Sequence, residues 1–233
     1  MKCWIIGYDP GGKDAHGVAA LEVHDETGRW TPDQLMLEQR STVGQVTKWF
    51  EQVCADGRVV AAGIDTLTEW NDGSSGWRPA DLWLRKSCKE VQNSVISPNY
   101  ISGAMSLNGA LLLHSLAARF RQDDTMVTEV HPKVCYFALT GNKANWTEHT
   151  SRTQMAHWLL EELSVPPPIE GFGRSDHKFD ATMATLAALR GVNGEWTLDL
   201  HAQVDDNCGK RALPFGLTHY WWPGKSQETG TTQ

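Results

Sequence analysis

Two short apolar segments of the chain each end on an aspartate. Residues 5–8 lead into Asp9, and residues 59–64 lead into Asp65. A proline and two glycines follow Asp9 and favour an immediate turn, so the strand presents that carboxylate at a sheet edge. The second segment is almost wholly apolar, as expected of a strand covered on both faces. The pattern predicts a layered α/β fold with two acidic strand ends, the place where a metal-binding carboxylate would sit.

Apolar periodicity predicts the elements around these two strands. Between residues 43 and 56, apolar side chains recur at three- and four-residue spacing, which gives a helix one buried stripe. We expect strands at 3–8, 16–23, 34–41, 59–64 and 126–130. We expect further helices at 104–121, 133–139, 150–163 and 176–190.

The length of 233 residues favours one domain with one core. We expect this domain to span residues 1–195, with an irregular insertion at about 66–102. Long irregular excursions inside a compact domain are usually functional or disordered. Residues 196–233 are interpreted as a C-terminal extension whose polar end is expected to be disordered.

The net charge of -7 argues against a broadly basic protein that coats DNA. Carboxylates gathered around divalent cations would make this formal charge overstate the negativity of a working site. The charge is therefore compatible with a local nucleic-acid site.

Cysteine usage and the N-terminus predict a cytoplasmic protein. The cysteines are five and widely spread, with no Cys-x-x-Cys pair, which favours reduced thiols over disulfides or structural zinc. The apolar run before Asp9 is too short for a signal peptide, and no long apolar span follows, so we expect no membrane segment. The cysteines are Cys3, Cys54, Cys88, Cys135 and Cys208.

The last predicted helix carries a second acidic pattern. Asp176 and Asp180 are four residues apart and project from one helix face, while alanines from Ala181 onward allow close packing on a sheet. A cation between the two carboxylates would offset their repulsion. The alternative is that Asp176 caps the helix and Asp180 is a solvated acid of the first turn.

The order of these elements resembles the ribonuclease H-like superfamily. Residues 7–11, together with the helix start from Asp176 to Ala181, resemble Holliday-junction resolvases of the RuvC type. A fuller pattern resembles an uncharacterised family of predicted RNase H-like nucleases over about residues 3–190. Its motifs are residues 63–65, 78–85, 129–132 and 176–181. Resolvases usually carry Glu at the position of Asp65, and the tail from residue 191 matches neither group.

The resemblance implies an α/β fold of the ribonuclease H-like type, with a mixed five-stranded sheet flanked by helices. It also implies a metal-dependent nuclease whose partner is DNA or RNA, and resolvase-like enzymes often act as homodimers. Two Mg²⁺ or Mn²⁺ ions can activate water and stabilise the leaving oxygen, which needs three or four carboxylates. We expect Asp9 to bridge both ions, Asp65 to bind one, and Asp180 with Asp176 to bind the other.

Other residues are secondary candidates. Glu129 is a reserve catalytic carboxylate or a strand-end cap, and His177 and His131 either orient groups for catalysis or make structural hydrogen bonds. A basic group is interpreted as substrate-binding because guanidinium and ammonium groups bind phosphate, against the alternative of solvated surface charges. It comprises Arg78, Arg85, Lys13 and Lys178. The tryptophans near Arg78 either stack on unpaired bases or form a local core.

Two other functions are alternatives to a nuclease. Actin-like and sugar-kinase ATPases share a related turn after the first strand, but they need a duplicated second domain for which 233 residues leave no room. A non-catalytic nucleic-acid-binding or assembly module on the same fold is the second, because a fold does not set a function. Divalent-metal binding separates that module from a nuclease.

Overall fold

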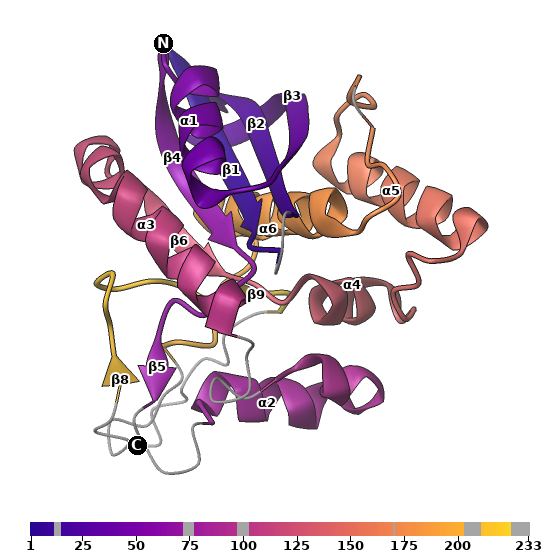
Figure 1. Ribbon diagram of the computed structural model, residues 1–233. Coiled ribbons are helices and arrows are strands. Elements are labelled where there is room, and N and C mark those ends of the chain that lie inside the picture. Colours follow the sequence, from indigo (N-terminus) through magenta and orange to yellow (C-terminus); the bar gives the residue numbers. More distant parts are fainter. Residues whose placement is uncertain (12–14, 72–76, 97–102, 170, 203–210, 225–233) are drawn as a thin grey trace.

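The computed structural model describes residues 1–11, 15–71, 77–96, 103–169, 171–202 and 211–224. Its centre is a five-stranded mixed sheet in the order β3-β2-β1-β4-β6 (Figure 1). The strands are β1 (Lys2–Asp9), β2 (His16–Glu26), β3 (Arg29–Arg40), β4 (Gly57–Ile64) and β6 (Met126–Glu129). The predicted α/β fold with a mixed five-stranded sheet is confirmed. Within the described ranges, no helix has the length and apolar character needed to cross a membrane.

Strand direction brings the acidic strand ends to one edge of the sheet. β2 is antiparallel to both β1 and β3, whereas β4 is parallel to β1 and β6 is parallel to β4. Tyr8 lies opposite Ile64, and Ile64 lies opposite Glu129. The carboxyl ends of β1, β4 and β6 therefore meet at the same edge.

Helices cover both faces of the sheet (Figure 1). α1 (Val43–Val53) and α3 (Gly103–Asp123) cover one face, where Phe50 and Leu112 belong to one buried cluster with Ile6 of β1. The other face is covered by α6 (His177–Val192), and α4 (Pro132–Thr140) and α5 (His149–Leu163) pack against α6. The two faces have separate apolar cores because successive strand residues point to opposite sides.

Glycines let α6 lie directly against the sheet. A Cβ atom added at Gly63 would lie 1.9 Å from the Ala184 carbonyl oxygen, and one added at Gly7 would lie 2.0 Å from that of Ala181. Gly7 and Gly63 are register partners on β1 and β4, so the backbone of α6 crosses both strands where they carry no side chain. This close approach positions the acidic start of α6 over the end of β1.

The strand β3 begins at Arg29, five residues before the predicted start at residue 34. Thr27 and Gly28 both have positive φ angles, 58° and 87°, and form the tight turn between β2 and β3. Residues 24–29 around this turn are exposed, so they carry no apolar alternation from which the hairpin could be predicted.

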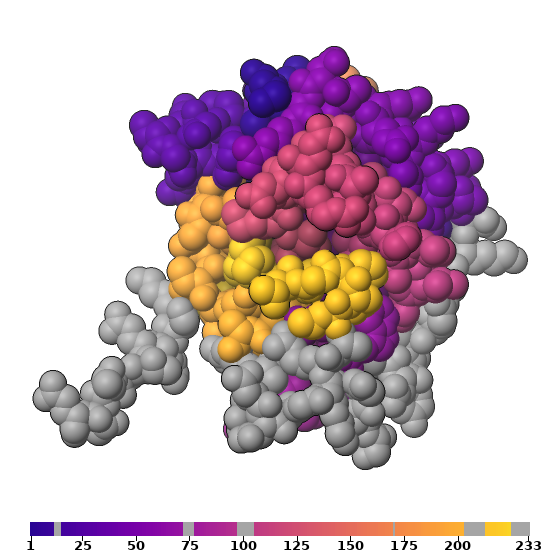
Figure 2. All heavy atoms as spheres, turned by 90° about the vertical axis from the view of Figure 1, so that its left-hand side faces the viewer, coloured from indigo at the N-terminus to yellow at the C-terminus, as the bar shows by residue number. Residues whose placement is uncertain are grey.

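The insertion and the C-terminal segment pack together. The insertion contains β5 (Trp70–Asn71), α2 (Pro79–Ser87) and the 3-10 helix η1 (Lys89–Ser94). The C-terminal segment contains β7 (Leu198–Asp199), β8 (Arg211–Ala212) and β9 (Trp221–Trp222), and β5 pairs with β8 while β7 pairs with β9. Figure 2 shows this segment, in yellow, lying along α3.

The C-terminal segment also covers the open edge of β6. The His219 backbone N–H donates to the Val127 carbonyl oxygen at 2.8 Å, and the Glu129 N–H donates to the His219 carbonyl oxygen at 2.8 Å. Tyr220 and Trp222 are buried in the core on the α6 side of the sheet. Residues 219–222 are thus part of the folded body.

Candidate active site

Asp9 and Asp65 stand side by side at the ends of adjacent parallel strands. Asp9 is the last residue of β1, and Asp65 follows β4 directly, where its backbone N–H donates to the Tyr8 carbonyl oxygen at 2.9 Å. Asp9 is only 3% exposed, while Asp65 is partly exposed. The two apolar strands that end on Asp9 and Asp65 therefore supply one half of an acidic site.

The start of α6 supplies the other half. Asp180, in the first turn, is buried, whereas Asp176 is the N-cap residue and is partly exposed. The Asp176 side chain makes no capping hydrogen bond to the helix. Its carboxylate instead faces Lys133 of α4, so the alternative in which Asp176 only caps the helix does not describe its contacts.

Lys133 joins the two helix carboxylates. Its Nζ atom lies 2.8 Å from Asp176 Oδ2 and 3.4 Å from Asp180 Oδ2. Lys133 is not among the site residues predicted from the sequence. Its position could have indicated it, because it follows β6 by four residues and lies in the first turn of a helix at the acidic edge. Asp180 and Asp176 raise the pKa of Lys133 against the opposing effect of burial, so the ammonium stays charged.

Burial and mutual repulsion disfavour the charged forms of three carboxyls. Burial raises the pKa of Asp9, Asp65 and Asp180. Repulsion from Asp176 raises the pKa of Asp9 further, and repulsion from Asp9 raises those of Asp65 and Asp180. The pKa of Asp180 rises to about 8. For Asp176, burial acts in the same direction, but the hydrogen bond and charge of Lys133 outweigh it and lower the pKa. A divalent cation bound to Asp9, Asp65 and Asp180 would favour their charged forms and lower these raised pKa values.

His177 contacts Asp9 across the site. Its Nδ1 atom lies 2.6 Å from Asp9 Oδ2, and this hydrogen bond raises the pKa of His177. The same contact opposes the effect of burial on the pKa of Asp9. His177 thus connects the first residue of α6 to the last residue of β1.

The chemistry of these side chains fits a hard divalent cation. Asp180 Oδ1 is buried and has no hydrogen-bond partner among the described residues, and carboxylate oxygens are the ligands that Mg²⁺ and Mn²⁺ prefer. No group of three or more potential His, Cys, Asp or Glu ligands converges closely enough to hold a metal ion in the described part of the chain. Among the described residues, Lys133 and His177 contact these carboxylates.

Glu129 and Arg78 do not join this group of carboxylates. Both are buried, and Arg78 donates to Glu129 at 2.8 and 2.5 Å and to Asp81 at 2.9 and 2.7 Å. Thr68 donates its backbone N–H to Glu129 at 2.8 Å. Burial opposes ionisation of Glu129, but the charge and hydrogen bonds of Arg78 outweigh it and lower the pKa. Arg78 therefore holds the insertion against β6 instead of facing solvent, where it was expected to bind phosphate.

The other basic candidates are placed as follows. Arg85 donates to the Val95 carbonyl oxygen at 2.9 Å and lies over the ring of Trp77, so it ties α2 to the end of η1. Lys178 lies beside the site on α6 and donates to the Gly171 carbonyl oxygen at 3.2 Å. Lys13 lies outside the described residues.

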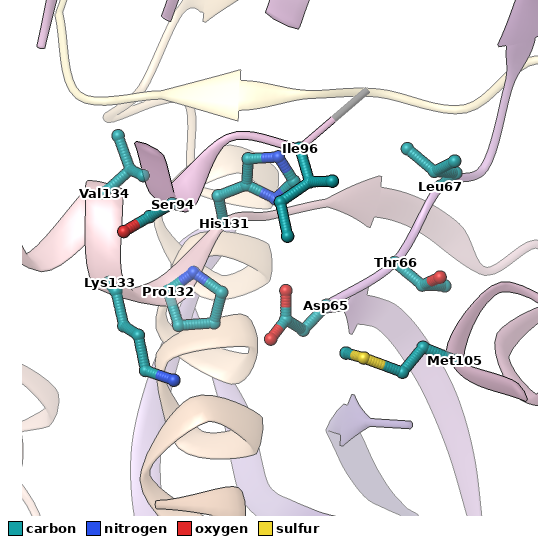
Figure 3. A pocket seen from close by; sticks show the side chains of 10 residues that line it. All are labelled: Asp65, Thr66, Leu67, Ser94, Ile96, Met105, His131, Pro132, Lys133 and Val134. Atoms are coloured by element: carbon teal, nitrogen blue, oxygen red, sulfur yellow. The ribbon is translucent and has the colours of Figure 1, made fainter. Parts of the chain in front are cut away.

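A pocket of about 420 Å³ opens beside the carboxylates (Figure 3). Asp65 points into it, and Lys133 lies at its side. Its other lining residues come from the loop after β4, the end of η1 and the residues after it, α3 and the start of α4. They are Thr66, Leu67, Ser94, Ile96, Met105, His131, Pro132 and Val134. A smaller hollow of about 210 Å³ includes Lys133, Asp176 and Asp180, so the two spaces share the Lys133 side chain.

The strand order, the antiparallel β2 and the acidic helix packed on the sheet define a ribonuclease H-like fold. The chain belongs to the family described as protein of unknown function (DUF429), whose model matches residues 7–201. Comparison with curated proteins found no match.

Solved structures similar to the chain include two of Thermus thermophilus RuvC. The first is 14% identical, with 82% of this chain and 96% of that chain covered and a TM-score of 0.43. The second, RuvC in complex with a Holliday junction substrate, is 12% identical, with 81% and 94% covered and a TM-score of 0.42.

Proposed function

We propose that the protein is a metal-dependent nuclease that hydrolyses phosphodiester bonds of nucleic acid. The observation that carries the proposal is the meeting of Asp9, Asp65 and Asp180 at one sheet edge, each with a pKa raised by burial and by its acidic neighbours. Buried like charges of this kind are costly unless a cation binds them.

Asp9, Asp65, Asp176 and Asp180 would hold two Mg²⁺ or Mn²⁺ ions. The chemistry that such ions supply is activation of a water molecule and stabilisation of the leaving oxygen. Asp9 is an electrostatic neighbour of Asp65 and of both α6 carboxylates and is the proposed shared ligand. His177 orients the Asp9 carboxylate through the 2.6 Å contact. Lys133 is the proposed phosphate contact, because its ammonium lies beside the acids and is partly exposed.

A non-catalytic nucleic-acid-binding module is the second candidate. It is favoured by the contacts of Lys133 with Asp176 and Asp180, which partly neutralise these acids without a metal ion. In such a module, Lys133 and His177 would be permanent structural partners of the acids. The two candidates differ in whether the purified protein binds divalent metal through Asp9.

The test combines metal binding with cleavage. Titration calorimetry with Mn²⁺ should give binding to the wild type that is lost in Asp9→Asn. Labelled single-stranded, duplex and branched DNA and RNA should be cut by the wild type only with Mg²⁺ or Mn²⁺, and not by Asp9→Asn. The matched control is Asp33→Asn, an exposed aspartate on β3, which should behave as the wild type. Absence of both metal binding and cleavage in the wild type would reject the nuclease and leave the binding module.

A further inference from the structure

We infer that the pocket beside Asp65 receives a single unpaired nucleobase, next to the phosphodiester at the carboxylate site. The inference rests on the proposed function and deepens it, because it names the class of substrate. It predicts that the protein acts on nucleotides outside a regular duplex: single strands, mismatches or branch points.

The first support is the continuity of the pocket with the acidic site. Asp65 lines the pocket and is an electrostatic neighbour of Asp9 and Asp180, and Lys133 lines it while contacting Asp176. Figure 3 shows the Asp65 carboxylate pointing into the space, with Lys133 at one side. A backbone phosphate held at the acids would therefore bring an attached base to this opening.

The second support is the lining of the pocket. Ile96 and Met105 provide apolar surface on two separate segments, and Ile96 is 47% exposed although it is a large aliphatic residue. The volume of about 420 Å³ falls within the range of pockets that take small organic ligands. A flat base has two apolar faces and a polar edge, so it matches a pocket that combines apolar side chains with polar groups.

The third support is an unused polar atom at His131. Its Nε2 atom is buried and has no hydrogen-bond partner among the described residues. Burial lowers the pKa of His131, which favours the neutral imidazole. One nitrogen of a neutral imidazole donates and the other accepts. Because His131 lines the pocket, a bound base would lie beside a ring that carries an unused polar atom.

A base in a regular duplex cannot reach such a pocket without leaving the stack. Extrusion costs unpairing and unstacking energy, and this cost is least for single-stranded or mismatched bases. The selectivity for unpaired nucleotides thus follows from seating one base inside the pocket and needs no particular base sequence.

The test measures binding with cleavage blocked. Fluorescence anisotropy of the full-length Asp9→Asn protein should give tighter binding to a labelled DNA single strand than to the same length of abasic strand or blunt duplex. Ser94→Leu fills the pocket from its rim and should weaken single-strand binding roughly tenfold, in the range of single base contacts. Ile96→Ala removes apolar contact and should weaken it less.

Matched controls carry the same changes at exposed positions away from the pocket. They are Ser87→Leu at the end of α2 and Ile169→Ala in the loop after α5, and both should bind as the Asp9→Asn parent does. Equal binding of base-bearing and abasic strands, or pocket variants that bind as their controls do, would overturn the inference. Such a result with intact metal-dependent cleavage by the wild type would leave the proposed function standing. Preferential binding of base-bearing strands without metal-dependent cleavage would support the pocket and reject the nuclease.

Discussion

His177 Nδ1 lies 2.6 Å from Asp9 Oδ2, and this one contact links the end of β1 to the start of α6. Asp9 and His177 are 168 positions apart in the sequence, yet each shifts the pKa of the other. The hydrogen bond raises the pKa of His177 and acts to lower that of Asp9, which burial raises. The pair therefore reports on the charge state of the candidate site before any cation is bound.

The metal-free wild type should lose stability as the pH rises above about 6.5. His177 has a raised pKa, so its contribution is complete below its ordinary value of 6.5 and is lost as the pH rises through the folded value. The raised pKa values of Asp9, Asp65 and Asp180 act in the same direction. Asp9→Asn removes the contributions of His177 and Asp9 and leaves those of Asp65 and Asp180, so the fall should become shallower. The measurement is the unfolding temperature from roughly pH 6 to pH 9 in a chelator, with NMR titration of His177. An equally steep fall in the variant would contradict the prediction.

Lys133→Met should bind Mn²⁺ more tightly than the wild type. The Lys133 ammonium contacts Asp176 and Asp180, so it competes with a metal ion for the same oxygens. Removal of a competing charge beside two carboxylates is expected to strengthen binding by roughly tenfold, about 1.4 kcal/mol. Calorimetry checks this, with Lys143→Met, an exposed lysine in the loop before α5, as control. Weaker or unchanged binding would show that Lys133 does not compete.

The five strands of the sheet and the edge at which its acids lie could be predicted from the sequence alone. Apolar strands that end on Asp9 and Asp65 are local patterns, and parallel neighbours must present their ends at one edge. Asp176 and Asp180 followed from helical spacing and alanine-rich packing. The structure brings these four acids together, and their role as metal ligands stays a prediction.

Long-range pairing accounts for what the sequence did not reveal. Arg78 and Glu129 are 51 positions apart, and nothing local indicates that they neutralise each other in the interior. Lys133 was missed because a lone lysine at a helix start is usually solvated, and only the tertiary fold places it between two acids. His219 pairs with Val127 and Glu129 through backbone hydrogen bonds that no local pattern encodes.

Arg78→Met should destabilise the fold by about 3–5 kcal/mol, because it leaves Glu129 and Asp81 as unpaired buried charges. Urea denaturation measures this loss. Arg121→Met, at an exposed position in the last turn of α3, should change stability little. A loss no larger than that of Arg121→Met would mean that the buried network adds no stability.

Gly63→Ala should damage both the fold and the acidic site. Its new Cβ would lie 1.9 Å from the Ala184 carbonyl oxygen, so α6 must move away from the sheet. Overpacking of this kind typically costs about 1–3 kcal/mol, and we expect the upper end because the obstacle is backbone.

The same displacement should carry Asp180 away from Asp9 and Asp65 and weaken Mn²⁺ binding in calorimetry. The matched control is Gly44→Ala in the first turn of α1, where nothing lies within 4 Å of the added atom. Since alanine is the better helix former, this control should keep or gain up to about 1 kcal/mol. If Gly63→Ala kept the wild-type stability and metal affinity, the close packing of α6 would not be what positions Asp180.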